Sequence, residues 1–169
     1  MSPKMLAGRS PNAFYKAIFK KVSVLMKTEF EQYQQSAFNE IKTLCKVQIE
    51  ENGDRKPLKI VLEPKNDFGQ ECLFISVYDD NITINYDYYE TFIKPKDETI
   101  EAFFDSTIGL IKEIVKEQLI VVTTYHKLHT FPVANLMRPE ESKRIARKSN
   151  FRARSFQGTY DDDYPPQEQ

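Results

Sequence analysis

Aspartate and tyrosine side chains gather in one segment, LFISVYDDNITINYDYY, residues 73–89. Asp79 and Asp80 are adjacent carboxylates, a residue type that can form an acid–base pair or bind a hard cation. Adjacent Asp and Asn residues are also what a hairpin turn selects. We therefore interpret Asp79 and Asp80 first as turn residues and keep catalysis or cation binding as the weaker alternative.

The histidines and cysteines have spacings that define no catalytic or metal site. His126 and His129 are the only histidines, and they follow a predicted strand, where positions i and i+3 point to opposite faces. A metal-dependent enzyme would need further ligands, and none stands at a recognisable zinc spacing. Cys45 and Cys72 show no CxxC spacing and are expected to be buried, reduced thiols. Without a nucleophile elbow, P-loop or dinucleotide fingerprint, we expect neither enzymatic activity nor a cofactor.

Charge is distributed unevenly along the 169 residues, although the net charge is only −1. Residues 1–28 hold six basic and no acidic side chains, whereas residues 50–105 hold fourteen acidic and six basic ones. The centre of the chain should therefore have a negative field, whose complement is a basic partner protein. No apolar run reaches the roughly 20 residues that span a bilayer, and no signal-peptide pattern begins the chain. We expect a cytoplasmic protein without a membrane partner.

The chain divides into three parts by composition. Residues 1–26 form a basic extension or short helix, in which Phe14, Ile18 and Val22 recur at helical spacing; a transit peptide or a vector-derived extension are the alternatives. Residues 27–160 have the length of a single domain. Residues 161–169 are acidic and proline-containing, and we expect a disordered tail.

Hydrophobic periodicity predicts an α+β domain, in which an antiparallel sheet packs against two main helices. The expected elements are a helix at 28–44, a hairpin over 47–63, a hairpin over 73–89, a helix from Asp97, a central strand at 118–125, a short helix from Pro139 and an edge strand within 150–160.

The hairpin over 73–89 allows a prediction of register. If Asp80 and Asn81 are the two turn residues, the numbers of paired residues sum to 161. The core face would then carry the pairs Val77–Ile84, Ile75–Tyr86 and Leu73–Tyr88. The outer face would present Tyr78, Asp87 and Tyr89, unless a further helix covers that face and makes the tyrosines a second core.

The outer face of this hairpin is the favoured binding surface. Tyrosines provide rigid contact area at protein interfaces, and acidic groups steer a basic partner. The predicted partner-binding residues are Tyr78, Asp79, Asp80, Asp87, Tyr89 and Glu90.

The main alternative is a nucleic-acid-binding accessory protein that uses the basic segment 138–154. This segment holds seven basic and two acidic residues together with Phe151, a mixture found at nucleic-acid sites. Its acids come before its bases, however, as in any well-capped helix. We therefore favour a solvated face over a nucleic-acid partner.

Three stretches carry a family resemblance: LFISVYDDNITINYDYYETF, VKEQLIVVTTY and RARSFQGTYDDDY. Together they resemble the small immunity proteins of bacterial polymorphic-toxin and contact-dependent inhibition systems, over about residues 28–162. The chain departs from that pattern at Glu90, where the family has histidine, and at Phe156, where it has tryptophan. The resemblance implies a non-catalytic antitoxin that binds the C-terminal domain of its cognate toxin. Many such toxins are basic nucleases, which fits the negative centre of the chain.

Overall fold

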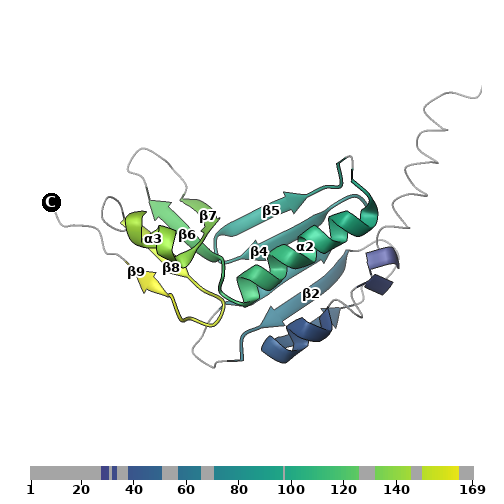
Figure 1. Ribbon diagram of the computed structural model, residues 1–169, viewed down its shortest axis with the longest axis horizontal. Coiled ribbons are helices and arrows are strands. Elements are labelled where there is room, and N and C mark those ends of the chain that lie inside the picture. The colour runs from purple at the N-terminus through teal and green to yellow at the C-terminus, as the bar shows by residue number, and fades with distance from the viewer. Residues whose placement is uncertain are drawn as a thin grey trace, which may run out of the picture.

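Two antiparallel sheets and the helices beside them make up an α+β domain, as predicted. The computed structural model describes residues 28–30, 32–33, 38–50, 57–65, 71–96, 98–125, 132–145 and 150–163. Five described strands form the first sheet in chain order (Figure 1): β1 (Lys46–Glu50), β2 (Leu58–Glu63), β3 (Leu73–Val77), β4 (Ile82–Tyr86) and β5 (Tyr89–Ile93).

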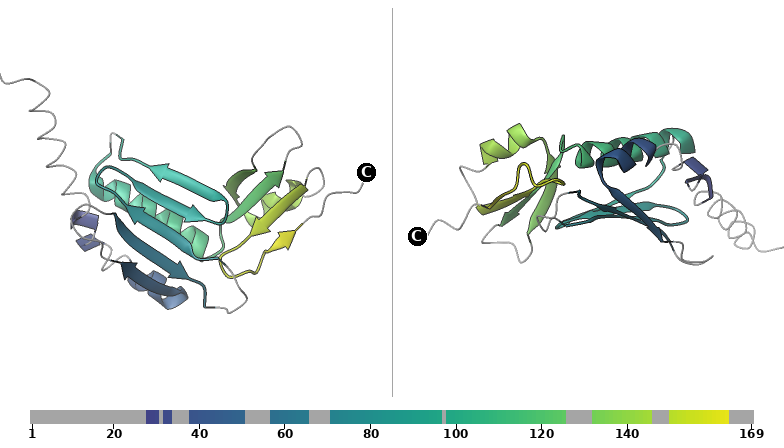
Figure 2. Two further views of the ribbon diagram at one scale, coloured as in Figure 1. Left: turned by 180° about the vertical axis from the view of Figure 1, so that it is seen from behind. Right: turned by 90° about the horizontal axis from the view of Figure 1, so that it is seen from below.

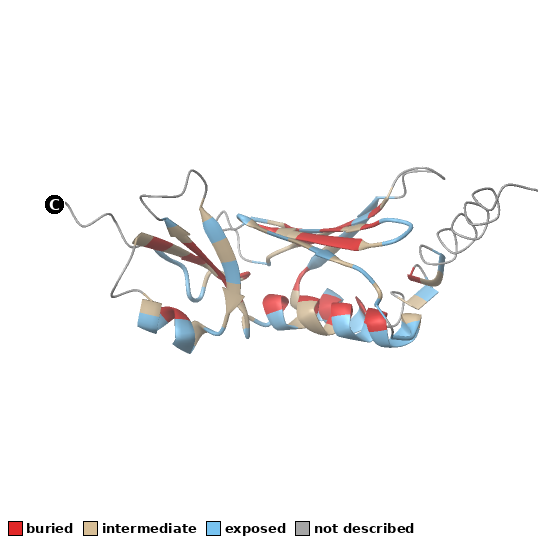
Figure 3. Cartoon of the chain, turned by 90° about the horizontal axis from the view of Figure 1, so that it is seen from above, coloured by how far each residue is buried: buried red, intermediate tan, exposed pale blue. Residues whose placement is uncertain are grey.

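Helices cover one face of the first sheet. Residues 28–30, 32–33 and 38–44 are helical, and α2 (Ile100–Val115) crosses the same face (Figures 1 and 3). The N-cap of α2 is Thr99, whose hydroxyl accepts a hydrogen bond from the Ala102 N–H at 3.2 Å. The expected start at Asp97 was therefore two residues too early. Within the described chain, no helix combines the length and apolar character needed to cross a membrane.

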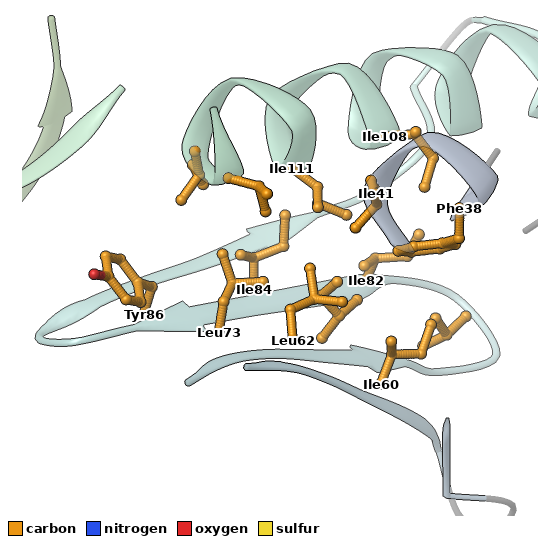
Figure 4. Close-up of a cluster of buried hydrophobic side chains, with 14 of the residues drawn as sticks. Phe38, Ile41, Ile60, Leu62, Leu73, Ile82, Ile84, Tyr86, Ile108 and Ile111 are labelled. Atoms are coloured by element: carbon orange, nitrogen blue, oxygen red, sulfur yellow. The ribbon is translucent and has the colours of Figure 1, made fainter. Parts of the chain in front are cut away.

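The core lies between this sheet face and the helices. Alternation along β2 and β3 buries one side of each strand, and α2 contributes its apolar stripe. Figure 4 shows the central side chains packed together: Phe38, Ile41, Ile60, Leu62, Leu73, Ile82, Ile84, Tyr86, Ile108 and Ile111.

The second sheet was not predicted as a separate sheet. Its described strand order is β7 (Val133–Met137), β6 (Ile120–Tyr125), β8 (Asn150–Arg154), β9 (Asp162–Asp163). Strand β6 is central, as expected, but in this sheet rather than in the first one. Strand β8 pairs on both sides, so the predicted edge strand is wrong. The short helix α3 (Pro139–Ile145) forms as predicted and lies beside this sheet (Figure 1).

The predicted register of the 73–89 hairpin is wrong by two positions. Val77 faces Ile82 and Ile75 faces Ile84, so paired numbers sum to 159. The turn residues are Asp79 and Asp80, because the Tyr78 N–H donates to the Asn81 carbonyl at 2.8 Å. A shift of two preserves the faces of these strands, since side chains alternate with a period of two.

Tyr88 lies between strands β4 and β5 and does not pair with Leu73, as the predicted hairpin required. The chain turns at Asp87 and Tyr88 into β5, so Tyr86 faces Tyr89. Asp87 has φ 51°, a left-handed conformation that Asp tolerates better than most residues. Tyr88 is therefore exposed at the turn. The prediction that Tyr88 is a core residue is wrong.

Asp162 and Asp163, which the sequence places in a disordered tail, form strand β9 and pair with Ala153 and Arg152, and residues 164–169 lie outside the described residues. The expectations for residues 1–26, for the turn at Asn52, and for His126 and His129 lie outside the described residues.

Candidate functional site

The side of the first sheet that faces away from the helices is the candidate site, here called the outer face. No described helix lies over it (Figure 2, right; Figure 3). The predicted cover by another helix is therefore not found among the described residues. Strand alternation places on this face, from β3 to β5, Phe74, Ser76, Thr83, Asn85, Glu90 and Phe92.

The six predicted binding residues lie at opposite ends of β4. Tyr78, Asp79 and Asp80 come before this strand, whereas Asp87, Tyr89 and Glu90 follow it. Glu90 is opposite Asn85 on β4, and Asn85 comes five residues after Asp80. At 3.3–3.4 Å for each residue of a strand, Asp80 and Glu90 are about 17 Å apart along the strand direction. These residues therefore form two groups and not one cluster.

The first group is exposed. Tyr78 has an exposed fraction of 41%, and both aspartates are exposed. The Asn81 amide donates to Asp80 at 2.6 Å, and Lys94 lies 3.2 Å from the other Asp80 oxygen. These contacts, the Asn81 hydrogen bond first, hold the pKa of Asp80 below its usual value. Asp80 is therefore an ionised turn residue with a lysine partner, while Tyr78 and Asp79 remain open to contact.

Asp87 is in a different environment from the one predicted. Its side chain is only 3% exposed, and one carboxylate oxygen lies 3.1 Å from Nη2 of Arg152 on β8. Arg152 also lies 3.5 Å from Glu71 and stacks over the Tyr88 ring at 5.5 Å. Asp87 therefore joins the two sheets and presents little surface to a partner.

Tyr89 also turns inward. It is half-buried and packs against the core beside Tyr86, whose own burial raises the pKa of its phenol. Of the second predicted group, Glu90 alone is exposed on the outer face.

Two phenylalanines on the outer face were not predicted as binding residues. Phe74 is 49% exposed and Phe92 is 65% exposed. They lie two strands apart and two residues apart along the strand direction, which gives about 12 Å. Asn85, opposite Phe74, and Thr83, opposite Phe92, lie between them on β4. The sequence signal for Phe74 was its alternation with the core residues Leu73 and Ile75. Phe92 gave no comparable signal, because it lies on β5, the strand that the predicted hairpin did not include.

Charge on the outer face is mixed. On β1 and β2, Lys46 is opposite Glu63 and Lys59 is opposite Glu50, so opposite charges pair across the strands. The unbalanced acids, Asp79 and Glu90, lie toward β4 and β5. The described surface is thus apolar near its centre, with lysines and acids paired on β1 and β2 and two unbalanced acids toward β4 and β5, rather than uniformly negative.

The three stretches that carry the family resemblance meet between the two sheets. Phe156 is fully buried, with its ring 6.0 Å from that of Tyr86. Glu117, at the end of α2, accepts hydrogen bonds from the N–H groups of Gln157 at 2.7 Å and Thr159 at 3.2 Å. Together with the Asp87–Arg152 ion pair, these contacts form what is here called the inter-sheet joint: Asp87, Tyr88, Glu117, Arg152 and Phe156.

Two arginines of the basic segment 138–154 lie against acidic side chains and add little positive charge to the surface. Arg152 pairs with Asp87 and Glu71, and Arg154 lies 4.0 Å from Asp161. Lys143 and Arg144 on α3 are exposed. Neutralising Arg152 and Arg154 would therefore test folding as well as nucleic-acid binding.

Cysteine chemistry has little support in the described residues. Cys45 is buried, and this burial raises the pKa of its thiol to about 11. Burial also raises the pKa of Cys72, which is only partly buried. Both groups are mainly thiols near neutral pH and are poor nucleophiles. No group of three or more metal-binding side chains occurs within the described part of the chain.

Comparison of the chain with protein-family models, with curated proteins and with solved structures gave no match in any of the three.

Proposed function

We propose that this chain is an immunity protein that binds the C-terminal domain of a cognate bacterial toxin and neutralises it. The observation that carries the proposal is the pair of exposed phenylalanines, Phe74 and Phe92, on a sheet face that no described helix covers. Large exposed aromatics with a polar rim are typical of protein interfaces. The resemblance of the three stretches supplies the class of partner.

The contact is centred on Phe74 and Phe92, with Tyr78, Asp79 and Glu90 at the rim. Aromatic anchors supply most of the affinity, because they bury large apolar area at a small entropic cost. The rim acids speed association with a basic toxin domain and contribute less to the final affinity. This protein acts by occupying the toxin surface and needs no catalytic residue of its own.

The test is co-expression with the toxin domain encoded next to its gene, with survival of the cells as the readout. The native chain should protect. Phe92→Glu should abolish protection, because it places a charge in the apolar centre of the contact. The matched control is Ile49→Glu on β1: Ile49 is 43% exposed and faces the opposite side of the same sheet. Protection by Phe92→Glu equal to that of Ile49→Glu would exclude the outer face, and death with the native chain would exclude the function.

A further inference from the structure

Strand β1 forms a free edge of the first sheet. It is the first strand in the sheet order and pairs only with β2 among the described strands (Figure 2, left). Four of its five residues are exposed, and one of them, Ile49, is a large apolar side chain with an exposed fraction of 43%. An edge strand of this kind is a template for pairing with a strand of another chain.

The backbone groups that are open to such pairing are those of Val47 and Ile49. The hydrogen bond from Tyr78 across the β3–β4 turn fixes the hydrogen-bonded positions of that hairpin, and such positions alternate along antiparallel strands. Because the β2–β3 and β1–β2 registers are regular, this alternation directs the N–H and C=O groups of Gln48 toward β2. The same groups of Val47 and Ile49 point away from the sheet.

The sequence of β1, KVQIE, is complementary to itself in the antiparallel orientation. When two copies pair around Gln48, Val47 of one copy is opposite Ile49 of the other, and their open backbone groups meet in hydrogen-bonded positions. Lys46 is then opposite Glu50, so that opposite charges meet in both outer pairs. This register uses all five residues of the strand and has the two-fold symmetry of most homodimers.

Strand β2 extends the charge complementarity on the outer face. Within one chain, Lys46 is opposite Glu63 and Glu50 is opposite Lys59. Across two paired copies, acids and bases therefore alternate along one row of four strands, in the order Glu63, Lys46, Glu50, Lys59.

The opposite side of the paired strands is apolar. Within one chain, Val47 is opposite Leu62 and Ile49 is opposite Ile60, and both β2 residues are fully buried. Pairing of two copies joins these side chains into one apolar row and covers the exposed part of Ile49. The hydrophobic effect therefore favours the same register as the charges do.

We propose that two copies of this chain associate through β1 in this register, which gives one continuous antiparallel sheet with five described strands from each copy. The two outer faces lie on the same side of that sheet. Phe92 is on β5, at the edge farthest from β1, so the dimer contact and the toxin contact are separate. A contact through one short strand from each copy is small, and the dimer therefore depends on concentration.

Sedimentation equilibrium of the full chain tests this proposal. As the concentration rises, a species with twice the 19.8 kDa mass of one chain should form. Lys46→Glu and Glu50→Lys each place like charges in both outer pairs, so each variant alone should associate at least about tenfold more weakly than the native chain. An equimolar mixture of the two variants restores opposite charges in both pairs and should form a heterodimer. The matched control Lys143→Glu reverses an exposed lysine on α3 and should associate like the native chain.

Two outcomes would overturn the proposal. A native chain that stays monomeric at millimolar concentration would show that β1 does not pair. A mixture that associates no better than the single variants would show that the contact lies elsewhere or has another register.

A backbone variant covers the case in which a charge variant does not fold. Ile49→Pro removes an N–H that points away from β2, a change that an edge strand tolerates, and it should abolish the dimer. Native association of folded Ile49→Pro would also overturn the proposal. Protection against the toxin should be the same with this monomeric variant as with the native chain, so failure of the dimer and failure of the immunity function are distinguishable.

Discussion

The outer face and the inter-sheet joint contain similar residue types in opposite settings. Phe92 and Glu90 on the outer face are exposed, whereas Phe156 and Asp87 in the joint are buried. Asp87 and Glu90 are three residues apart in one tyrosine-rich segment, yet one is an internal ion-pair partner and the other faces solvent. The most distinctive residues of a sequence can therefore be fold determinants, while the surface available for binding depends on less conspicuous neighbours.

Replacing a phenylalanine by alanine should give the largest difference in unfolding free energy between the joint and the outer face. Phe156→Ala removes a fully buried ring that packs on Tyr86, and it should lower the free energy of unfolding by about 4 kcal/mol. Phe92→Ala, at 65% exposure, should change it by under about 0.5 kcal/mol. Urea denaturation monitored by circular dichroism measures both. Equal losses would show that Phe92 is part of the folded core.

Replacing a carboxylate residue by alanine should give a smaller difference in unfolding free energy between the two regions. Asp87→Ala leaves Arg152 without its close carboxylate partner, and it should lower the free energy of unfolding by about 3 kcal/mol, as for other broken buried pairs. Glu90→Ala should change it by under about 0.5 kcal/mol. Asp87→Asn, which tolerates the left-handed backbone but lacks the charge, isolates the ion pair from backbone strain. If Asp87→Ala has the same stability as the native chain, the joint does not depend on this pair.

Much of the fold was readable from the sequence, because strand alternation and helix periodicity depend on local pattern. The 73–89 register was missed because Asp79, Asp80 and Asn81 are all good turn formers, so the pattern could not decide which two occupy the turn. Strand β5 was not predicted because the dipeptide Asp87–Tyr88 is not a typical turn sequence. The clue was that Asp is one of the few residues that adopt a positive φ readily.

The candidate site was predicted less well than the fold. Sequence correctly placed Tyr78, Asp79 and Glu90 at the surface, but it could not show that Asp87 meets Arg152, 65 positions later in the chain. Such a contact depends on how the two sheets pack. The sequence pattern therefore selected buried and exposed residues of this one segment together.

The exposed ion pairs of Glu40 with two lysines should have a smaller effect on stability than the Asp87–Arg152 pair. Glu40 lies between Lys112 and Lys116, with Lys112 Nζ at 2.9 Å, and hydrogen bonds from these two lysines, Lys116 first, lower the pKa of Glu40 to about 2. A depressed carboxyl pKa stabilises the fold above the unfolded value near 4.5, and this contribution is lost as the pH falls toward 2. In Glu40→Gln, the loss of stability between pH 4.5 and 2 should be smaller than in the native chain. Identical pH profiles in urea titrations would show that the lysines do not stabilise ionised Glu40.

The most direct measurement is the affinity of the double variant Phe74→Ala and Phe92→Ala for the cognate toxin domain, by titration calorimetry. We predict a dissociation constant at least about 100-fold weaker than that of the native chain, from the loss of two aromatic anchors. The free energy of unfolding should change little, since both side chains are about half exposed or more. Native affinity in this folded variant would contradict the assignment of the outer face as the binding surface.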